Sequence, residues 1–172
     1  MATPIKFGTD GWRAIIADDY TVENVRRVAE GTALWMKNNG MTQVVIGHDC
    51  RFGGKMFAET TTRVMGAFGI KVKLAPDFVS TPMVSLGVVK TGSDLGVVVT
   101  ASHNPHTYNG FKLKSSLGGP ALPKDIEAVE VLVPDTPSVS SYPTIAEMLE
   151  NGSLAYVDLE KNKIYKGRYL VN

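Results

Sequence analysis

The sequence predicts an α/β fold with three layers, in which helices cover both faces of a mixed four-stranded sheet. Short apolar segments alternate with stretches whose apolar residues recur at helical spacing, a pattern typical of parallel strands joined by crossover helices. The connection between the last two predicted strands is too short for a crossover helix, so we expect a mostly parallel sheet whose last strand is antiparallel. The 172 residues are 44% hydrophobic, which suffices for one domain with a real core.

Three amphipathic helices are predicted in the first half of the chain. The first begins after Thr21, a good N-cap, and ends before Gly40. The second covers residues 54–69. The third begins after Ser80 and ends at Gly92. Because the second and third helices each connect two predicted strands, we expect right-handed crossovers.

Four strands are predicted around these helices. Three are short apolar runs at residues 43–47, 70–74 and 95–99, and the fourth covers residues 110–114. The run at 70–74 alternates apolar residues with lysines, which indicates that one of its faces is less buried. We therefore expect it near an edge of the sheet.

The last third of the chain is less regular. Pro123 can begin a helix, and the Pro- and Ser-rich stretch that follows has no apolar period and is interpreted as a linker. Thr144 begins a capping-box pattern for a short helix, and the residues after Gly152 form a tail with too few apolar side chains for a core of its own. We expect one domain at 1–134, and a linker, helix and tail toward a second domain at 135–172.

Composition excludes several classes of partner. A formal net charge of +1 gives no overall field for nucleic acid or an anionic membrane, so any attraction for phosphate must be local. No apolar run approaches the roughly 18 residues of a membrane span. The single cysteine, Cys50, cannot form an internal disulfide, and the first residues form no apolar signal region. Together these features favour a cytoplasmic protein with no nucleic-acid or membrane partner.

Several candidate catalytic residues lie in residues 97–112, VVVTASHNPHTYNGFK. Here a predicted strand ends and presents Ser102 and His103, and open α/β proteins bind ligands at the carboxyl ends of their strands. Ser, His, Asn and Pro are also common turn residues, so composition alone leaves a plain surface loop as an alternative. A Ser-His hydrolase is disfavoured, because no G-x-S-x-G elbow is present and the histidine is the next residue in the chain.

The order of the residues in this stretch is more specific than their composition. TASHNP followed by NGFK resembles the phosphoserine loop of the α-D-phosphohexomutases, the phosphoglucomutase and phosphomannomutase family. FGTDGWR at residues 7–13 and GHDCR at residues 47–51 are similar to two further motifs, in the family order. The family's enzymes have four domains and these motifs belong to the first. The resemblance implies an intramolecular phosphotransferase that moves phosphate between the 1- and 6-positions of a hexose phosphate, through a phosphoserine and a hexose 1,6-bisphosphate.

The resemblance assigns roles to four side chains. Ser102 would carry the phosphoryl group covalently, and Lys112 would neutralise the transferring phosphate. Arg13 would face the serine loop and bind phosphate oxygens through its guanidinium, and His103 would give or take a proton. Each of three roles has a structural alternative: a turn cap for Ser102, a surface lysine for Lys112, and a loop-holding hydrogen bond for His103.

Three further charged residues of the matched motifs are less certain. Asp10 lies in the N-terminal motif, and Asp49 and Arg51 lie just past the first predicted strand. For the latter two, an ion pair that ties the loop down is at least as good an interpretation as contact with a ligand.

The resemblance also implies Mg²⁺, held by phosphorylated Ser102 and by an aspartate-rich loop of a second domain. No D-G-D-x-D run occurs in this sequence, so the 172 residues alone are expected to be inactive and to bind magnesium weakly. A non-catalytic phosphate-binding or regulatory domain is the alternative, and a domain that docks onto a partner is another. The surface that would meet a second domain is expected to be exposed, moderately apolar and prone to self-association.

Overall fold

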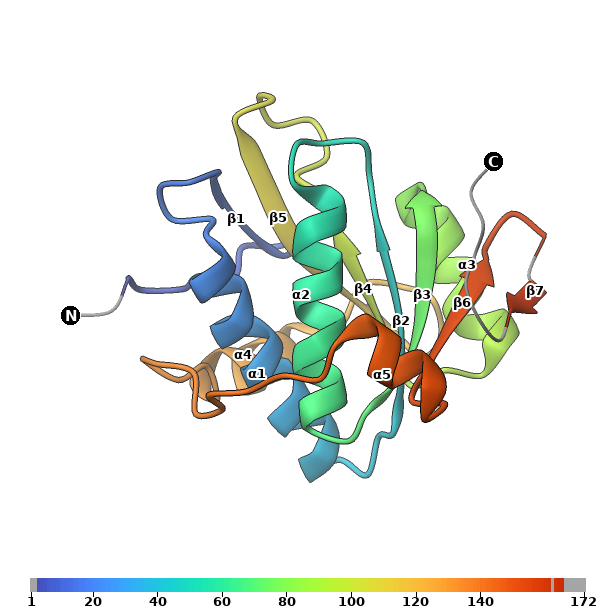
Figure 1. Ribbon diagram of the computed structural model, residues 1–172. Coiled ribbons are helices and arrows are strands. Elements are labelled where there is room, and N and C mark those ends of the chain that lie inside the picture. Colours follow the sequence, from blue (N-terminus) through green and yellow to red (C-terminus); the bar gives the residue numbers. More distant parts are fainter. Residues whose placement is uncertain (1–2, 162, 166–172) are drawn as a thin grey trace.

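A seven-stranded mixed sheet organises the computed structural model, which describes residues 3–161 and 163–165 (Figure 1). The strands lie in the order β1 (Trp12–Ile15), β5 (Tyr108–Ser115), β4 (Leu95–Val99), β2 (Gln43–His48), β3 (Lys71–Phe78), β6 (Leu154–Asp158) and β7 (Lys163–Tyr165). The central four, β4, β2, β3 and β6, run parallel, and the strands at both sides are antiparallel. The predicted α/β fold with a mixed sheet is confirmed, but the prediction of four strands is wrong.

Helices cover both faces of this sheet (Figure 1). The larger core is packed by α1 (Val22–Asn38), α2 (Gly54–Ala67), α4 (Pro123–Val131) and α5 (Ile145–Glu150), and α3 (Thr81–Thr91) covers the smaller core on the other face. The predicted caps are confirmed: Thr21 and Ser80 each accept from the backbone three residues on, and Thr144 forms the full capping box. Among the described residues, no helix is long and apolar enough to cross a membrane.

Three strands differ from the sequence-based expectation. β3 is not an edge strand, because it pairs with β2 on one side and with β6 on the other. β6 lies in the part of the chain expected to be a tail, and its Leu154 and Val157 are buried. With only five residues, β6 is too short to show a clear alternation of apolar and polar side chains. β1 lies inside the FGTDGWR motif and its continuation, and pairs antiparallel with β5. Each of these strands pairs with a strand that is distant in sequence, and the local sequence pattern gives no indication of such a partner.

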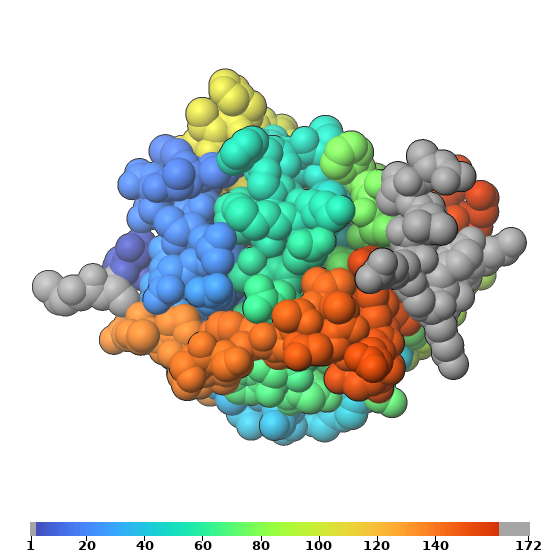
Figure 2. All heavy atoms as spheres, in the orientation of Figure 1, coloured from blue at the N-terminus to red at the C-terminus, as the bar shows by residue number. Residues whose placement is uncertain are grey.

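The Pro- and Ser-rich segment at residues 134–143, interpreted as a linker, is hydrogen-bonded to the helices it crosses. Arg27 Nε donates to Pro134 O at 2.7 Å, and Glu30 Oε2 accepts from Ser138 N at 2.9 Å. Further along, Arg63 Nε donates to Pro143 O at 2.9 Å. Figure 2 shows this segment in orange, running across α1 and α2. Buried polar side chains of α1 therefore satisfy backbone groups of a stretch that has no secondary structure.

Candidate active site

The serine loop, residues 100–107, joins the carboxyl end of β4 to the start of β5. Ser102 is exposed in it and has a φ of 56°, a left-handed conformation that is uncommon for residues other than glycine. Tyr108 to Ser115 then return antiparallel beside β4. Gly110 permits this close return, because a Cβ there would lie 2.5 Å from the carbonyl oxygen of Thr100. The predicted nucleophile thus stands at the carboxyl edge of the sheet.

Lys112 is the buried cation of the site. Its position opposite Val98 in the β4–β5 ladder buries the side chain, which is 3% exposed. Its Nζ donates to Asp10 Oδ2 at 2.5 Å and lies 3.4 Å from Ser102 Oγ. The surface-lysine alternative is therefore wrong, because this ammonium is buried and faces the serine hydroxyl.

The N-terminal segment supplies the other charges. Gly11, at a φ of 95°, lets the segment lie against β5, since a Cβ there would meet the carbonyl oxygen of Phe111 at 2.6 Å. Arg13 Nη1 donates to Asn104 Oδ1 of the serine loop at 2.8 Å, so this arginine does face the loop as expected. Its Nη2 also lies 3.7 Å from Asp10 Oδ2. Arg13 and Asp10 therefore tie the N-terminal segment to the serine loop and β5.

Asp10 and the three cations around it, Arg13, Lys112 and Lys114, form a group of charges called the Asp10 cluster below. Lys112 and Arg13 approach its Oδ2, and Lys114 Nζ lies 3.8 Å from its Oδ1. Partial burial would raise the pKa of Asp10, but the hydrogen bond from Lys112 and the charges of Lys112, Lys114 and Arg13 outweigh it and lower that pKa below 3.8. Asp10 is therefore ionised at neutral pH, and one negative charge is shared among three positive ones.

Two side chains hold the backbone of the serine loop, Arg51 from the segment after β2 and Thr100 from within the loop itself. Arg51 donates to three of the loop's carbonyls and to that of Tyr108, the first residue of β5, and Thr100 Oγ1 accepts from Ser102 N at 3.0 Å. His103, in contrast, is exposed and makes no hydrogen bond or ion pair with any described residue. The loop is therefore held by Arg51 and not by His103, so the structural alternative for His103 is not observed.

The structure brings together Ser102, Lys112 and Arg13, as expected, and adds side chains that sequence reasoning did not single out. Lys114 is one: it lies two residues beyond Lys112 on the same strand, so both lysines occupy one face. The two-residue spacing could therefore have identified Lys114 as a second cation of the site. The contributions of Asn104 and Thr100 depend on how the loop folds back, and no local pattern indicates them.

The described residues do not form a complete magnesium site. They include no group of three or more His, Cys, Asp or Glu side chains that could hold a metal ion. The two carboxylates nearest the serine loop are engaged, Asp10 with three cations and Asp49 with Thr100 and Arg51. Ser102, once phosphorylated, would add an anionic oxygen ligand of the kind that magnesium prefers.

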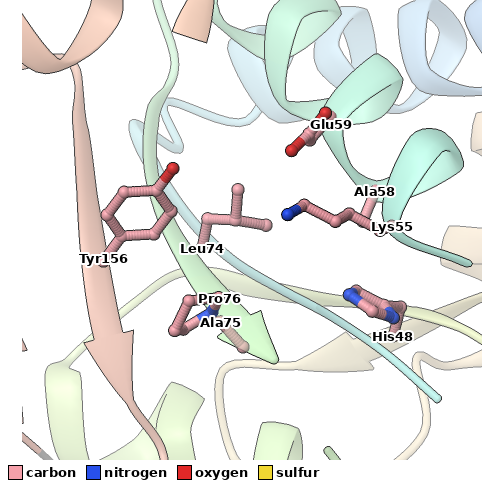
Figure 3. Close-up of a pocket in the computed structure, with 8 residues that line it drawn as sticks. All are labelled: His48, Lys55, Ala58, Glu59, Leu74, Ala75, Pro76 and Tyr156. Atoms are coloured by element: carbon pink, nitrogen blue, oxygen red, sulfur yellow. The ribbon is translucent and has the colours of Figure 1, made fainter. Parts of the chain in front are cut away.

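A separate small cavity of about 50 Å³ lies between α2, β2, β3 and β6 (Figure 3). Its walls include Leu74, Lys55 and Glu59, together with His48. Nδ1 of the buried His48 is 2.8 Å from Asp49 O, whereas its Nε2 has no partner among the described residues. The space is roomy enough for a few water molecules. None of its lining residues belongs to the serine loop or to the Asp10 cluster.

Fold and site together define a class of protein: an α/β domain that presents an exposed serine at the carboxyl edge of its mixed sheet, beside a buried lysine ammonium. The chain belongs to the phosphoglucomutase/phosphomannomutase family, because the family model for its alpha/beta/alpha domain I matches residues 4–138.

Relatives and solved structures agree with this assignment. A phosphoglucomutase of Staphylococcus saprophyticus is 32% identical over 94% of this chain and 30% of its own length. A phosphoribomutase of Saccharomyces cerevisiae is 36% identical over 73% of the chain and 21% of its own length. A solved structure described as a putative phosphomannomutase from Thermus thermophilus superposes with a TM-score of 0.78 at 34% identity, over 93% of this chain and 38% of that one. This chain thus spans between a fifth and two fifths of these proteins.

Proposed function

We propose that this chain is the phosphoserine-bearing domain of a phosphohexomutase, in which Ser102 carries the phosphoryl group that moves between the 1- and 6-positions of a hexose phosphate. One observation carries the proposal. The exposed hydroxyl of Ser102 stands at the carboxyl edge of the sheet, and a buried ammonium, Lys112 Nζ, lies 3.4 Å from it. A buried cation beside an exposed serine is the arrangement that a covalently held phosphate requires.

The charges near Ser102 suit a phosphoserine. Three cations share one carboxylate, so the cluster has about two positive charges in excess, and a phosphoserine carries about −1.5 to −2 at neutral pH. Phosphorylation would therefore nearly neutralise the cluster. An unmodified serine needs no such excess of positive charge.

The transfer to Ser102 is an exchange of one phosphorus–oxygen bond for another. The bond from Ser102 Oγ to phosphorus forms while the bond from phosphorus to a sugar oxygen of the hexose bisphosphate breaks. The serine proton leaves Oγ, and the departing sugar oxygen gains a proton. We assign the proton exchange to His103, which is exposed on the same loop, and the charge neutralisation to Lys112, with Arg13 binding phosphate oxygens.

Magnesium is a cofactor only of the longer protein in this proposal. Phosphorylated Ser102 would be its ligand from this chain and the remaining ligands would come from elsewhere. When bound, the ion supplies further neutralisation of the phosphate. Lys112 and Arg13 act from this chain whether or not the ion is present.

The 172 residues are proposed to be inactive as a mutase by themselves, because a bisphosphate that must turn over between two half-reactions needs surrounding walls. Residues 1–134 would carry the phosphoserine site, and 135–172, whose α5 and β6 pack onto the same core and sheet, would lead toward a second domain, in a cytoplasmic protein. Two large apolar side chains near the carboxyl ends of the parallel strands are exposed: Phe52, the residue after Arg51, at 78%, and Phe78, the last residue of β3, at 68%. We propose that these exposed apolar side chains favour self-association of the isolated chain, which light scattering would detect.

Incubation with glucose 1,6-bisphosphate followed by intact-mass measurement and peptide mapping tests the central proposal. We expect one added phosphate, located on Ser102, and none in a Ser102→Ala chain. Phosphate found only on other serines would overturn the carrier role. Reversible binding of inorganic phosphate without any covalent product would instead support the non-catalytic phosphate-binding domain.

A further inference from the structure

We propose that Arg51, Asp49 and Thr100 are positioning residues that fix the backbone of Ser102 for phosphoryl transfer. Together they surround Ser102 with a closed set of hydrogen bonds, called the Ser102 frame below. The inference rests on the proposed function of Ser102 as phosphate carrier. Its test includes a measurement that does not depend on that function.

Arg51 is the centre of the Ser102 frame, because its guanidinium binds three carbonyls of the serine loop and one at the start of β5. Nη1 donates to the carbonyls of Pro105 at 2.7 Å and Tyr108 at 3.0 Å, and Nη2 donates to those of Ser102 at 2.8 Å and Asn104 at 2.6 Å. A planar guanidinium with five donors can make such a set, whereas a lysine ammonium has three donors on one nitrogen. All the acceptors are backbone atoms, so the side chains of the loop remain available for a ligand.

Asp49 and Thr100 close the Ser102 frame on the other side of the serine. Thr100 Oγ1 donates to Asp49 Oδ2 at 2.5 Å and accepts from Ser102 N at 3.0 Å. Asp49 Oδ1 accepts from the backbone N–H of Arg51 at 3.0 Å, and Asp49 Oδ2 lies 3.5 Å from Arg51 Nε. Both the N–H and the carbonyl of Ser102 are therefore held, the first through Thr100 and the second through Arg51.

The Ser102 frame explains how Ser102 keeps a φ of 56° without being glycine. Such a backbone conformation costs on the order of 1–3 kcal/mol and persists only where the surroundings impose it. The carboxylate of Asp49 also offsets the charge of Arg51, so Arg51 contributes geometry to the site, whereas Lys112 and Arg13 contribute charge. This separation makes Arg51 a positioning residue rather than a catalytic one.

Two substitutions break the Ser102 frame at different points, and a third is a matched control. Arg51→Lys removes most of the carbonyl contacts, and Thr100→Val removes the acceptor for Ser102 N with little change of shape. Arg63→Lys is the control, since Arg63 also donates to two backbone carbonyls, of Tyr142 and Pro143, far from the serine loop in sequence. All three chains are compared with wild type by thermal unfolding, so that loading is judged on folded protein.

The first measurement is the rate at which glucose 1,6-bisphosphate loads phosphate onto Ser102. Displacing a reacting group by about 1 Å can cost about 100-fold in rate. We expect Arg51→Lys and Thr100→Val to load about 10- to 100-fold more slowly at saturation, with a half-saturating concentration within about twofold of wild type. Arg63→Lys should load at the wild-type rate. Equal rates in all four chains would overturn the inference while leaving the phosphate carrier intact.

The second measurement is hydrogen exchange of the amides at Ser102 and Asn104, which reports local opening of the loop and needs no phosphorylation. We expect roughly tenfold or faster exchange there in both frame variants and no change in Arg63→Lys. If wild type accepts no phosphate on Ser102, the proposed function fails and exchange alone decides on the Ser102 frame. Wild-type exchange in folded Arg51→Lys and Thr100→Val chains would refute it.

Discussion

Replacing Lys112 by methionine removes the one buried ammonium beside Ser102 among the described residues, while keeping an unbranched side chain of similar length. Methionine can fill the apolar surroundings of the lysine stem, because the stem of a buried lysine packs like a hydrocarbon. Asp10 loses its closest partner but keeps Lys114 at 3.8 Å and Arg13 at 3.7 Å. The substitution therefore tests charge at the serine rather than integrity of the core.

The magnitude follows from the contacts of Lys112. A hydrogen bond to a charged group contributes about 1.5–3 kcal/mol, so its loss from a transferring phosphate should slow the loading of Ser102 by about 10- to 150-fold. The effect on folding should be smaller than the roughly 3–5 kcal/mol typical of breaking a fully buried pair, since Asp10 is partly exposed and stays paired. We expect a loss of about 1–2 kcal/mol in the free energy of unfolding.

The assay is single-turnover loading with glucose 1,6-bisphosphate, quenched and read by intact mass, beside urea unfolding of the same samples. Lys90→Met is the matched control, because Lys90 is an exposed lysine in the last turn of α3, remote from the serine loop. The control should load at the wild-type rate. A Lys112→Met chain that is folded and loads within about twofold of wild type would refute the role of Lys112 in charge neutralisation.

Three further outcomes follow from the structure. Because the pKa of Asp10 is lowered in the fold, its ion pairs stabilise the chain above the unfolded pKa near 3.8 and lose this effect as pH falls through the lower folded value. In urea titrations the stability gap between wild type and Asp10→Asn should therefore be constant from neutral pH to about pH 5 and shrink as pH falls further, and a gap that stays constant at low pH would contradict this. Gly110→Ala should lower the free energy of unfolding by about 1–3 kcal/mol, because the new Cβ would lie 2.5 Å from the carbonyl oxygen of Thr100; unchanged urea midpoints would refute this. In a coupled assay with glucose 1-phosphate, magnesium and bisphosphate, the purified 172-residue chain should show no turnover, and rates above about 1 per second would overturn the single-domain interpretation.

Local signals in the sequence predicted the local structure well. The caps at Thr21, Ser80 and Thr144 lie where expected, because each uses a short side-chain contact within its own turn. The antiparallel return of β5 beside β4 also followed from a short connection. These features depend on neighbours in the chain, which a single sequence displays.

What the sequence did not indicate depends on contacts between distant segments. The position of β3 inside the sheet requires β6, about eighty residues further along, and its alternating lysines argued for an edge. Lys73, one of them, instead turns its ammonium to Thr91 O, and burial lowers its pKa. In the same way, the four carbonyls that Arg51 binds point toward one guanidinium only after the serine loop has folded.

The pairing of β1 with β5 also constrains the order in which the molecule can be completed during synthesis. Trp12 lies opposite Phe111, so the N-terminal segment leaves the ribosome well before its partner strand exists. At about 5–20 residues per second, it waits several seconds, with the apolar side of Trp12 unpaired. Asp10 and Arg13 meet Lys112 and Asn104 only when this gap closes. The charges around the serine are thus assembled by a contact of very long range, and a nascent chain has a complete serine motif some time before it has the cluster that surrounds it.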